Sequence, residues 1–264
     1  MNTVLLAALA IALGGAQAKP DGGAPRMAKL HGKVRYQHAA RLVTDLADHE
    51  VQLLDPKSEQ PVATTKTDAQ GNYQFEVKPG QYVLKTSFAK LSRVAGDTEV
   101  KKLVELKADE SVSETLSATD GTRCLSGHAH IETPAGEVEA RKLALGSEVW
   151  TRDPTGARVP GRVVGLQSSA VEPEYQPLQL TLSDGRAVVL STRHPLADGR
   201  PAGSVRTHET LDGAEVRSAA LVAYDLPVTY DLLVDGGDGT YWADGIALGS
   251  TMQPMLPLLG DAGP

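Results

Sequence analysis

The stretch Thr67-Asp68-Ala69-Gln70-Gly71-Asn72-Tyr73-Gln74-Phe75-Glu76-Val77 begins with a turn and continues as an alternating run of polar and apolar residues. Alternation with a period of two indicates a β-strand with one buried face. Similar short runs lie on both sides, among them 50–54 and 100–106, and turns such as Pro79-Gly80 separate them. Short strands spaced by turns are typical of an antiparallel β-sandwich. We therefore expect an all-β fold that begins with a small sandwich.

Composition and charge exclude several classes of function. The chain has 264 residues, 33 acidic and 26 basic side chains, a net charge of −7 and a single Cys. Its length suggests one or two domains, and its acidic balance argues against a nucleic-acid partner. One Cys excludes an internal disulfide framework and a multi-Cys zinc or iron–sulfur site. No cofactor is expected. No apolar run reaches the roughly 18–20 residues that a membrane span needs.

The N-terminus resembles an export signal. Val4 to Leu13 is an unbroken apolar run, and Ala16-Gln17-Ala18 has the small-x-small pattern of a signal-peptidase site. We interpret residues 1–18 as a secretory signal and residues 19–28 as a flexible leader. The alternative is a short buried helix. Export to the periplasm, the cell surface or the medium is expected, and a lone thiol is unusual in these oxidising compartments.

Residues 29–117 carry motifs of one known module. These are Gly32-x-Val34, Val51-x-Leu53, the turn and strand from Thr67 to Val77, and Pro79-Gly80-x-Tyr82. The stretch resembles the carboxypeptidase regulatory-like domain, a transthyretin-type β-sandwich. The resemblance implies a structural or adhesive module rather than a catalytic one, and its partner is unknown.

A polar linker, residues 118–123, ends immediately before the only Cys. Residues 124–251 show further short strands, among them a hairpin predicted at 178–190 and strands at 221–226, 230–234 and 239–248. We expect a second, mostly β unit over 124–251 and a Pro-rich tail over 252–264.

The second unit contains an ordered set of motifs. They are Cys124-Leu125-Ser126-Gly127, Leu190-Ser191-Thr192-Arg193-His194-Pro195, Thr229-Tyr230-Asp231-Leu232-x-Val234, and Thr240-Tyr241-Trp242-Ala243-Asp244-Gly245-Ile246. In this order they resemble the Hint domain, the autoprocessing module of hedgehog proteins and inteins. The resemblance covers about 130 residues, and it is the ordered set rather than any single motif that carries it.

The resemblance implies roles for five residues. The thiol of Cys124 would attack the carbonyl carbon of Arg123 and replace the amide by a thioester. A His can protonate the poor amide leaving group, because its side chain exchanges protons readily near neutral pH. The family's Thr-x-x-His motif reads Ser191-x-x-His194 here, which keeps a hydroxyl. Asp231 matches an acidic position that helps to tune the site.

Departures from the family decide which reaction remains. Inteins end in His-Asn, and the Asn cyclises to free the downstream peptide. Gly249 and Ser250 stand at these positions, and Ser has no side-chain amide. We therefore expect an N-to-S acyl shift at Arg123–Cys124 without splicing. The acceptor of the thioester would be water or a small amine or alcohol, because nothing after Ser250 matches the sterol-recognition region of hedgehog relatives.

Two other classes of function remain open. One is a degenerate, uncleaved Hint fold that serves as an exported binding or surface protein. The other is a thiol hydrolase that uses Cys124 and His194 on an external substrate. Two minor hypotheses are a metal held by His128 and His130, for which no third ligand is evident, and a Ca²⁺ loop at 235–239, where a plain turn is favoured.

Overall fold

The computed structural model describes residues 26–37, 42–89, 97–119 and 123–252. Nearly all of its regular structure is β-strand, and the only helical elements among these residues are two 3-10 turns. The all-β prediction is therefore confirmed. The expected signal and most of the leader lie outside the described residues. None of the described segments forms a helix with the length and hydrophobicity needed to cross a lipid bilayer.

The first unit consists of two sheets. One has β1 at its centre, between β2 and β5, with β8 and β9 also paired to β1. The other runs β4-β3-β6-β7. Most pairings are antiparallel, whereas β8 and β9 run parallel to β1. The strands are β1 (Ala28–Gln37), β2 (Val43–Asp45), β3 (Glu50–Leu54), β4 (Pro61–Lys66), β5 (Asn72–Val77), β6 (Gly80–Phe88), β7 (Thr98–Leu106), β8 (Ser111–Ser113) and β9 (Leu116–Thr119).

One hydrophobic core joins these two sheets. Tyr73, Phe75 and Val77 point inward from β5, as their alternation predicts, and Leu53 and Leu84 meet them from the other sheet. Gly32 has a specific role, because a Cβ there would lie 1.7 Å from the carbonyl oxygen of Glu114. The core therefore follows from the sequence pattern. The relation to the carboxypeptidase regulatory-like domain stays a prediction.

The second unit has a larger number of shorter strands. Its elements are β10 (Leu125–Ser126), β11 (His130–Thr133), β12 (Gly136–Glu139), η1 (Ala140–Lys142), β13 (Glu148–Arg152), β14 (Arg158–Ala170), β15 (Leu178–Leu182), β16 (Ala187–Leu190), η2 (Ala202–Ser204), β17 (Thr210–Leu211), β18 (Ala214–Leu221), β19 (Val228–Val234), β20 (Tyr241–Ala243) and β21 (Ile246–Leu248). β12-β11-β20-β21 form a separate four-stranded sheet. The predicted hairpin at 178–190 is confirmed as β15 and β16, with Gly185 at a φ of 95° in the turn.

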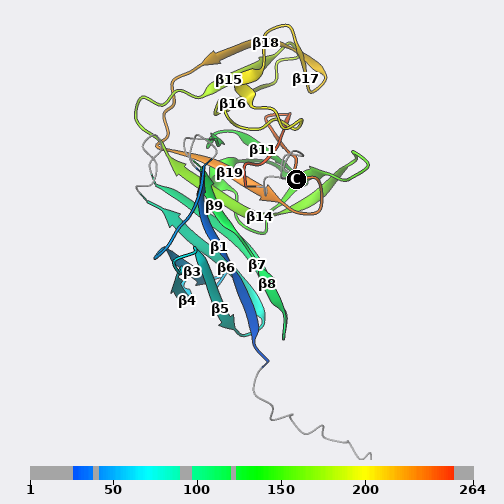
Figure 1. Ribbon diagram of the computed structural model, residues 1–264. Helices are drawn as coiled ribbons and strands as arrows, with labels where there is room; N and C mark the ends of the chain where they lie inside the picture. The colour runs from blue at the N-terminus through cyan, green and yellow to red at the C-terminus, as the bar shows by residue number, and fades with distance from the viewer. Residues whose placement is uncertain (1–25, 38–41, 90–96, 120–122, 253–264) are drawn as a thin grey trace, which may run out of the picture.

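The two units share one sheet, a connection that the sequence pattern does not anticipate. The sheet runs β17-β18-β15-β16-β10-β19-β14-β7-β6-β3-β4. The junction is the antiparallel pairing of β7 with β14, and Figure 1 shows these strands side by side where the units meet. The predicted boundary at 118–123 falls partly outside the described residues, and Ala118 and Thr119 belong to β9.

One strand prediction is wrong. The apolar run at 221–226 is not a strand, because β18 ends at Leu221 and the next strand begins at Val228. Tyr224 in this segment instead accepts a hydrogen bond from the backbone N–H of Gly127, at 3.0 Å, and donates one to the carbonyl of Val228, at 2.7 Å. Its side chain therefore connects the residue after β10 to the first residue of β19.

Candidate functional site

Strand pairing brings the predicted site residues together. The short strand β10 lies between β16 and β19, with Leu125 opposite both Leu190 and Tyr230. The residue before Leu125 is Cys124, the residue after Leu190 is Ser191, and the residue after Tyr230 is Asp231. Three motifs that lie far apart in the sequence therefore meet at one place in the sheet. The backbone N–H of Ser191 donates to the carbonyl of Cys124 at 2.8 Å, which fixes the two motifs to each other.

The thiol of Cys124 is fully buried and lies against β14. It donates a long hydrogen bond of 3.8 Å to Oγ of Ser169, and the amide of Gln167 donates to the sulfur at 3.7 Å. Burial raises the pKa of Cys124 to about 12, and the negative charge of Asp231 contributes to the same rise. The resting side chain is therefore a protonated thiol at neutral pH. A group that takes its proton during attack is needed to make it a nucleophile.

His194 lies against the carbonyl that precedes Cys124. Its Nδ1 is 2.6 Å from the carbonyl oxygen of Arg123, and the imidazole is fully buried. Because a carbonyl oxygen only accepts hydrogen bonds, Nδ1 must carry a hydrogen. This hydrogen polarises the carbonyl that Cys124 would attack, and it is placed to stabilise an oxyanion there.

The loop that carries His194 is fixed by its backbone. The N–H of His194 donates to the carbonyl of Ser191 at 3.0 Å, and its carbonyl accepts from Ala202, in η2, at 2.9 Å. Ser191 is buried, and its Oγ accepts the N–H of Arg193 at 3.3 Å. The hydroxyl of Ser191 thus contributes to the shape of the His194 loop.

Asp231 is a buried carboxylate that accepts several hydrogen bonds. Its Oδ1 accepts a hydrogen bond from the backbone N–H of Leu232 at 2.8 Å and another from the hydroxyl of Tyr241 at 3.1 Å. Its Oδ2 accepts from the N–H of Thr251 at 2.7 Å, from the hydroxyl of Thr251, and from Oγ of Ser250 at 3.5 Å. The residues that follow β21 therefore close over the carboxylate and hold it in place.

Tyr241 connects Asp231 to His194. Its hydroxyl lies 3.0 Å from Nε2 of His194 as well as 3.1 Å from Oδ1 of Asp231, and the ring is fully buried. Burial, followed by the charge of Asp231, raises the pKa of Tyr241 well above its usual value, so this hydroxyl keeps its proton.

The two hydrogen bonds of Tyr241 are compatible with two arrangements of protons on His194 and Asp231. Both hydrogen bonds of Tyr241 form when an imidazolium donates to it and it donates to a carboxylate. Both also form when a carboxylic acid donates to it and it donates to a neutral imidazole. The two arrangements hold the same number of protons and differ by one shift along each bond. When one proton is added to a neutral imidazole and a carboxylate at these positions, Tyr241 can therefore pass it between Asp231 and His194 while both of its hydrogen bonds remain.

The first unit reaches this site through Thr98. Its hydroxyl donates to Oγ of Ser169 at 3.1 Å, and both side chains are buried. The register explains the contact, because Thr98 lies opposite Ser169 across the β7–β14 pair and Thr229 lies opposite Ser169 on the other side. The first unit therefore contacts the site through the side chain of Ser169, which in turn lies beside the thiol.

Four residues of this site were not predicted as site residues. Gln167, Ser169 and Thr98 lie outside every motif. The strand register places Gln167 and Ser169 at the thiol and Thr98 against Ser169. Tyr241 lies within a quoted motif, but its hydroxyl gains its role from contacts with two other elements. The one signal in the sequence for such residues is a polar residue at a position that the alternating pattern of a strand assigns to its buried face.

His128 and His130, the pair considered as metal ligands, each lie beside a different aspartate. His128 pairs with Asp225 at 3.0 Å, whereas His130 pairs with Asp244 at 3.2 Å, so the two imidazoles do not share a site. No group of three or more His, Cys, Asp or Glu side chains in the described ranges is arranged to hold a metal ion. In the segment considered for Ca²⁺, Asp235 accepts from the backbone N–H of Arg162 at 2.8 Å, as an acidic turn residue does.

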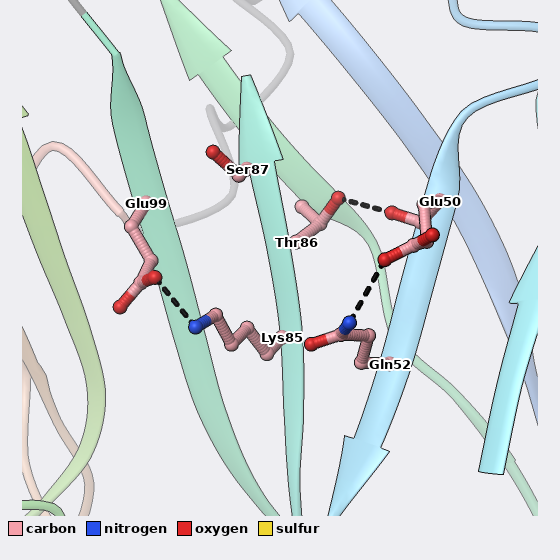
Figure 2. Close-up of a pocket in the computed structure, with 6 residues that line it drawn as sticks. All are labelled: Glu50, Gln52, Lys85, Thr86, Ser87 and Glu99. Atoms are coloured by element: carbon pink, nitrogen blue, oxygen red, sulfur yellow. Dashed lines mark hydrogen bonds and ion pairs between the residues drawn. The ribbon is translucent and has the colours of Figure 1, made fainter. Parts of the chain in front are cut away.

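Two surface hollows lie on the first unit, away from Cys124. One, of about 360 Å³, lies over β3, β6 and β7, where Lys85 pairs with Glu99 at 2.7 Å (Figure 2). Gln52 and Thr86 both hydrogen-bond to Glu50 in the same view. The other, of about 670 Å³, includes His31, Lys33 and Tyr73. Neither is lined by Cys124, His194 or Asp231, each of which has a relative exposure of 0%.

Comparisons with known proteins give structural likenesses. No family model and no curated protein matches the chain. A bacterial intein-like domain from Clostridium thermocellum is 20% identical and has a TM-score of 0.42, with 49% of this chain and 99% of that one covered. A DnaB intein from Synechocystis sp. PCC 6803 is 16% identical, with a TM-score of 0.42 and coverage of 49% and 99%. The Ssp DnaB mini-intein variant M86 is 16% identical, with a TM-score of 0.44 and coverage of 50% and 96%.

Proposed function

We propose that the second unit is a Hint-type autoprocessing module that performs an N-to-S acyl shift at Arg123–Cys124. The observation that carries this proposal is the 2.6 Å contact between Nδ1 of His194 and the carbonyl oxygen of Arg123, with the only thiol of the chain on the next residue. Nucleophile and carbonyl belong to adjacent residues, so proximity supplies much of the rate. The ordered motifs of the sequence give the same assignment to Cys124, Ser191, His194 and Asp231.

The attack step uses Asp231 and His194 together. Sγ of Cys124 bonds to the carbonyl carbon of Arg123 while the thiol proton passes to the carboxylate of Asp231. The carbonyl oxygen becomes an oxyanion that accepts the hydrogen of His194 Nδ1. A buried carboxylate is a suitable acceptor here, because burial and the charge of Asp231 disfavour a thiolate at Cys124, so the proton must move during the attack.

Collapse of this intermediate breaks the amide. The bond from the carbon of Arg123 to the nitrogen of Cys124 breaks, and the nitrogen takes the proton of His194 Nδ1. Tyr241 then gives its proton to Nε2 of His194 and takes the proton that Asp231 received. The products are a thioester between Arg123 and Cys124, a free amine on Cys124, a neutral imidazole and a restored carboxylate.

The reaction stops at cleavage or transfer rather than splicing. Gly249 and Ser250 supply no amide side chain that can cyclise, and Oγ of Ser250 instead points to Asp231 at 3.5 Å. Water attacking the thioester carbon breaks the carbon–sulfur bond, returns the thiol and leaves a carboxylate on Arg123. A small amine or alcohol would cap the same carbon. The site is buried, so the thioester is shielded until an acceptor reaches it.

The proposal extends to the setting of the protein. The apolar run and the small-x-small motif before Lys19 support export to the periplasm, the cell surface or the medium. The first unit is then the exported part that carries the acyl group of the thioester at Arg123, and it has a structural or adhesive role. The single Cys of an exported chain is explained, because its thiol is buried and reserved for the acyl shift.

Intact mass of the purified chain tests the proposal. Wild-type protein incubated with and without an added thiol is compared with Cys124→Ala and His194→Ala variants. We expect fragments that meet at Arg123–Cys124 in the wild type alone. His130→Ala is the matched control, since His130 is a half-exposed histidine outside the site, and it should cleave like the wild type. Full-length wild-type chain under all conditions would contradict the proposal.

A second function is favoured by one observation, the burial of a protonated thiol. If Cys124 never attacks, the protein is an uncleaved binding or surface module on the same fold. That hypothesis predicts a persistent full-length chain in which Cys124→Ala is silent. A thiol hydrolase with an external substrate is less favoured, because the thiol, the imidazole and the carboxylate are all shielded from solvent.

A further inference from the structure

The cleavage point lies between two strands that pair with each other. β7 precedes Arg123 in the chain and β14 follows Cys124, and their antiparallel register runs from Thr98 opposite Ser169 to Lys102 opposite Gly165. The backbone N–H of Ala170 extends this register by donating to the carbonyl of Asp97 at 3.0 Å. The backbone hydrogen bonds of this pair do not depend on the Arg123–Cys124 peptide.

Side chains strengthen the same junction. Met252, after the last strand, is buried in the core of the first unit, and Leu233 of β19 packs against that core. The fit is close, because a Cβ on Gly165 would lie 2.9 Å from Cε of Met252 and 3.0 Å from Cβ of Leu233. The Thr98–Ser169 hydrogen bond adds a buried polar contact across the same boundary.

Separation of the two units would expose unpaired backbone groups at the edge of β7 and apolar side chains at the junction. β7 has β6 on one side and β14 on the other, so removal of β14 would turn it into an open sheet edge. Unpaired edges expose backbone groups and promote association with other strands. The apolar contacts of Met252 and Leu233 would also enter water, which is unfavourable.

We infer that cleavage at Arg123–Cys124 leaves a nicked, non-covalent complex of two chains rather than a released first unit. The partner that each half binds is the other half of this chain, through the β7–β14 pair and Met252. This inference rests on the proposed function for its setting, but the interface itself does not. One consequence is that the acyl group of the thioester stays beside His194, so the acceptor must come to the complex.

A nick made by another route tests the inference separately. The full chain with Cys124→Ala, which cannot form a thioester, receives a recognition sequence for a site-specific protease between Asp120 and Gly121. After complete cutting, verified by mass under denaturing conditions, size-exclusion chromatography with light scattering measures the native mass. We expect both fragments in one peak with the mass of the uncut chain. Two separate peaks would overturn the inference, whatever the wild type does.

Hydrogen exchange provides a second measurement on the same material. We expect the backbone amides of β7 to keep the protection that they show in the uncut chain. Loss of protection throughout β7 after the cut would contradict the inference. Amides of β1, whose partners all lie in the first unit, serve as the internal reference. Self-cleavage of the unmodified wild type is followed in parallel, so failure of the proposed function and failure of the interface give different results.

Discussion

The hydroxyl of Tyr241 lies 3.0 Å from Nε2 of His194, and Nδ1 of the same ring lies 2.6 Å from the carbonyl oxygen of Arg123. One buried imidazole thus joins the peptide bond before Cys124 to a tyrosine that also contacts Asp231. In the proposed reaction these buried, hydrogen-bonded groups form a proton path. The proposed reaction depends on this path, and each of its groups can be tested separately.

Replacement of Tyr241 by Phe removes the relay but keeps the ring. We expect the acyl shift to slow by about tenfold or more, because His194 then lacks a route for recovering its proton and loses a hydrogen bond worth about 1 kcal/mol. The pH dependence of the rate should also change, which a merely structural role would not produce. Tyr82→Phe, which removes an exposed tyrosine hydroxyl in the first unit, is the control and should cleave at the wild-type rate. Equal rates and pH profiles for Tyr241→Phe and the wild type would exclude the relay.

Alkylation tests the state of the thiol. Burial raises the pKa of Cys124 to about 12, and only the thiolate reacts rapidly with iodoacetamide. At pH 8 we expect almost no labelling of the folded chain over a time in which urea-unfolded chain is fully labelled. Mass spectrometry measures the labelled fraction. Rapid labelling of the folded protein would show that the thiol is exposed or ionised, contrary to the structure.

The same shift in pKa makes stability depend on pH. The unfolded chain loses its thiol proton near the usual pKa of about 8.5, whereas the folded chain keeps it until about 12. The folded state therefore binds more protons in this window, and the free energy of unfolding falls as pH rises through it. We expect urea unfolding at pH 8 and pH 10 to show this fall relative to Cys124→Ala. Parallel pH dependences for the two proteins would contradict it.

A double-mutant cycle tests the contact between the units. Thr98→Val and Ser169→Ala each remove one partner of a buried hydrogen bond, so each should lower the free energy of unfolding by about 1–3 kcal/mol. The pair should cost less than the sum by about 0.5–1.5 kcal/mol, because the hydrogen bond between Thr98 and Ser169 can be lost only once. Thr98→Val combined with Thr133→Ala is the additive control. Additivity for Thr98 with Ser169 would show that the contact does not form.

Much of the fold could be predicted from local patterns. The alternation from Asn72 to Val77 predicts β5 and its inward face, and the Asp184-Gly185 turn predicts the hairpin of β15 and β16. The run at 221–226 misled, because an apolar segment can be fixed by a side chain such as Tyr224 instead of a sheet. Nothing in a local pattern specifies which strand edge pairs with which, so the β7–β14 junction could not be predicted.

Some residues of the candidate site could be predicted from sequence motifs, and others could not. The order of the motifs that contain Cys124, Ser191, His194 and Asp231 resembles a known module. In the structure Cys124 directly precedes β10, and Ser191 and His194 follow β16. Asp231 lies in β19, which pairs with β10. Gln167, Ser169 and Thr98 have roles that depend on register between distant strands, whereas the role of Tyr241 depends on its side-chain contacts with His194 and Asp231. A one-residue change in that register would turn Gln167 and Ser169 away from the thiol.

The most direct test of the central claim is to trap the thioester. Wild-type chain incubated with a high concentration of a small thiol, or with hydroxylamine, is analysed by intact mass and fragment sequencing. An acyl shift at Arg123–Cys124 predicts an upstream fragment that ends at Arg123 and carries the trapping group on its terminal carbonyl, and no such fragment in Cys124→Ala. An upstream fragment that ends elsewhere, or full-length chain alone after prolonged incubation, would contradict it.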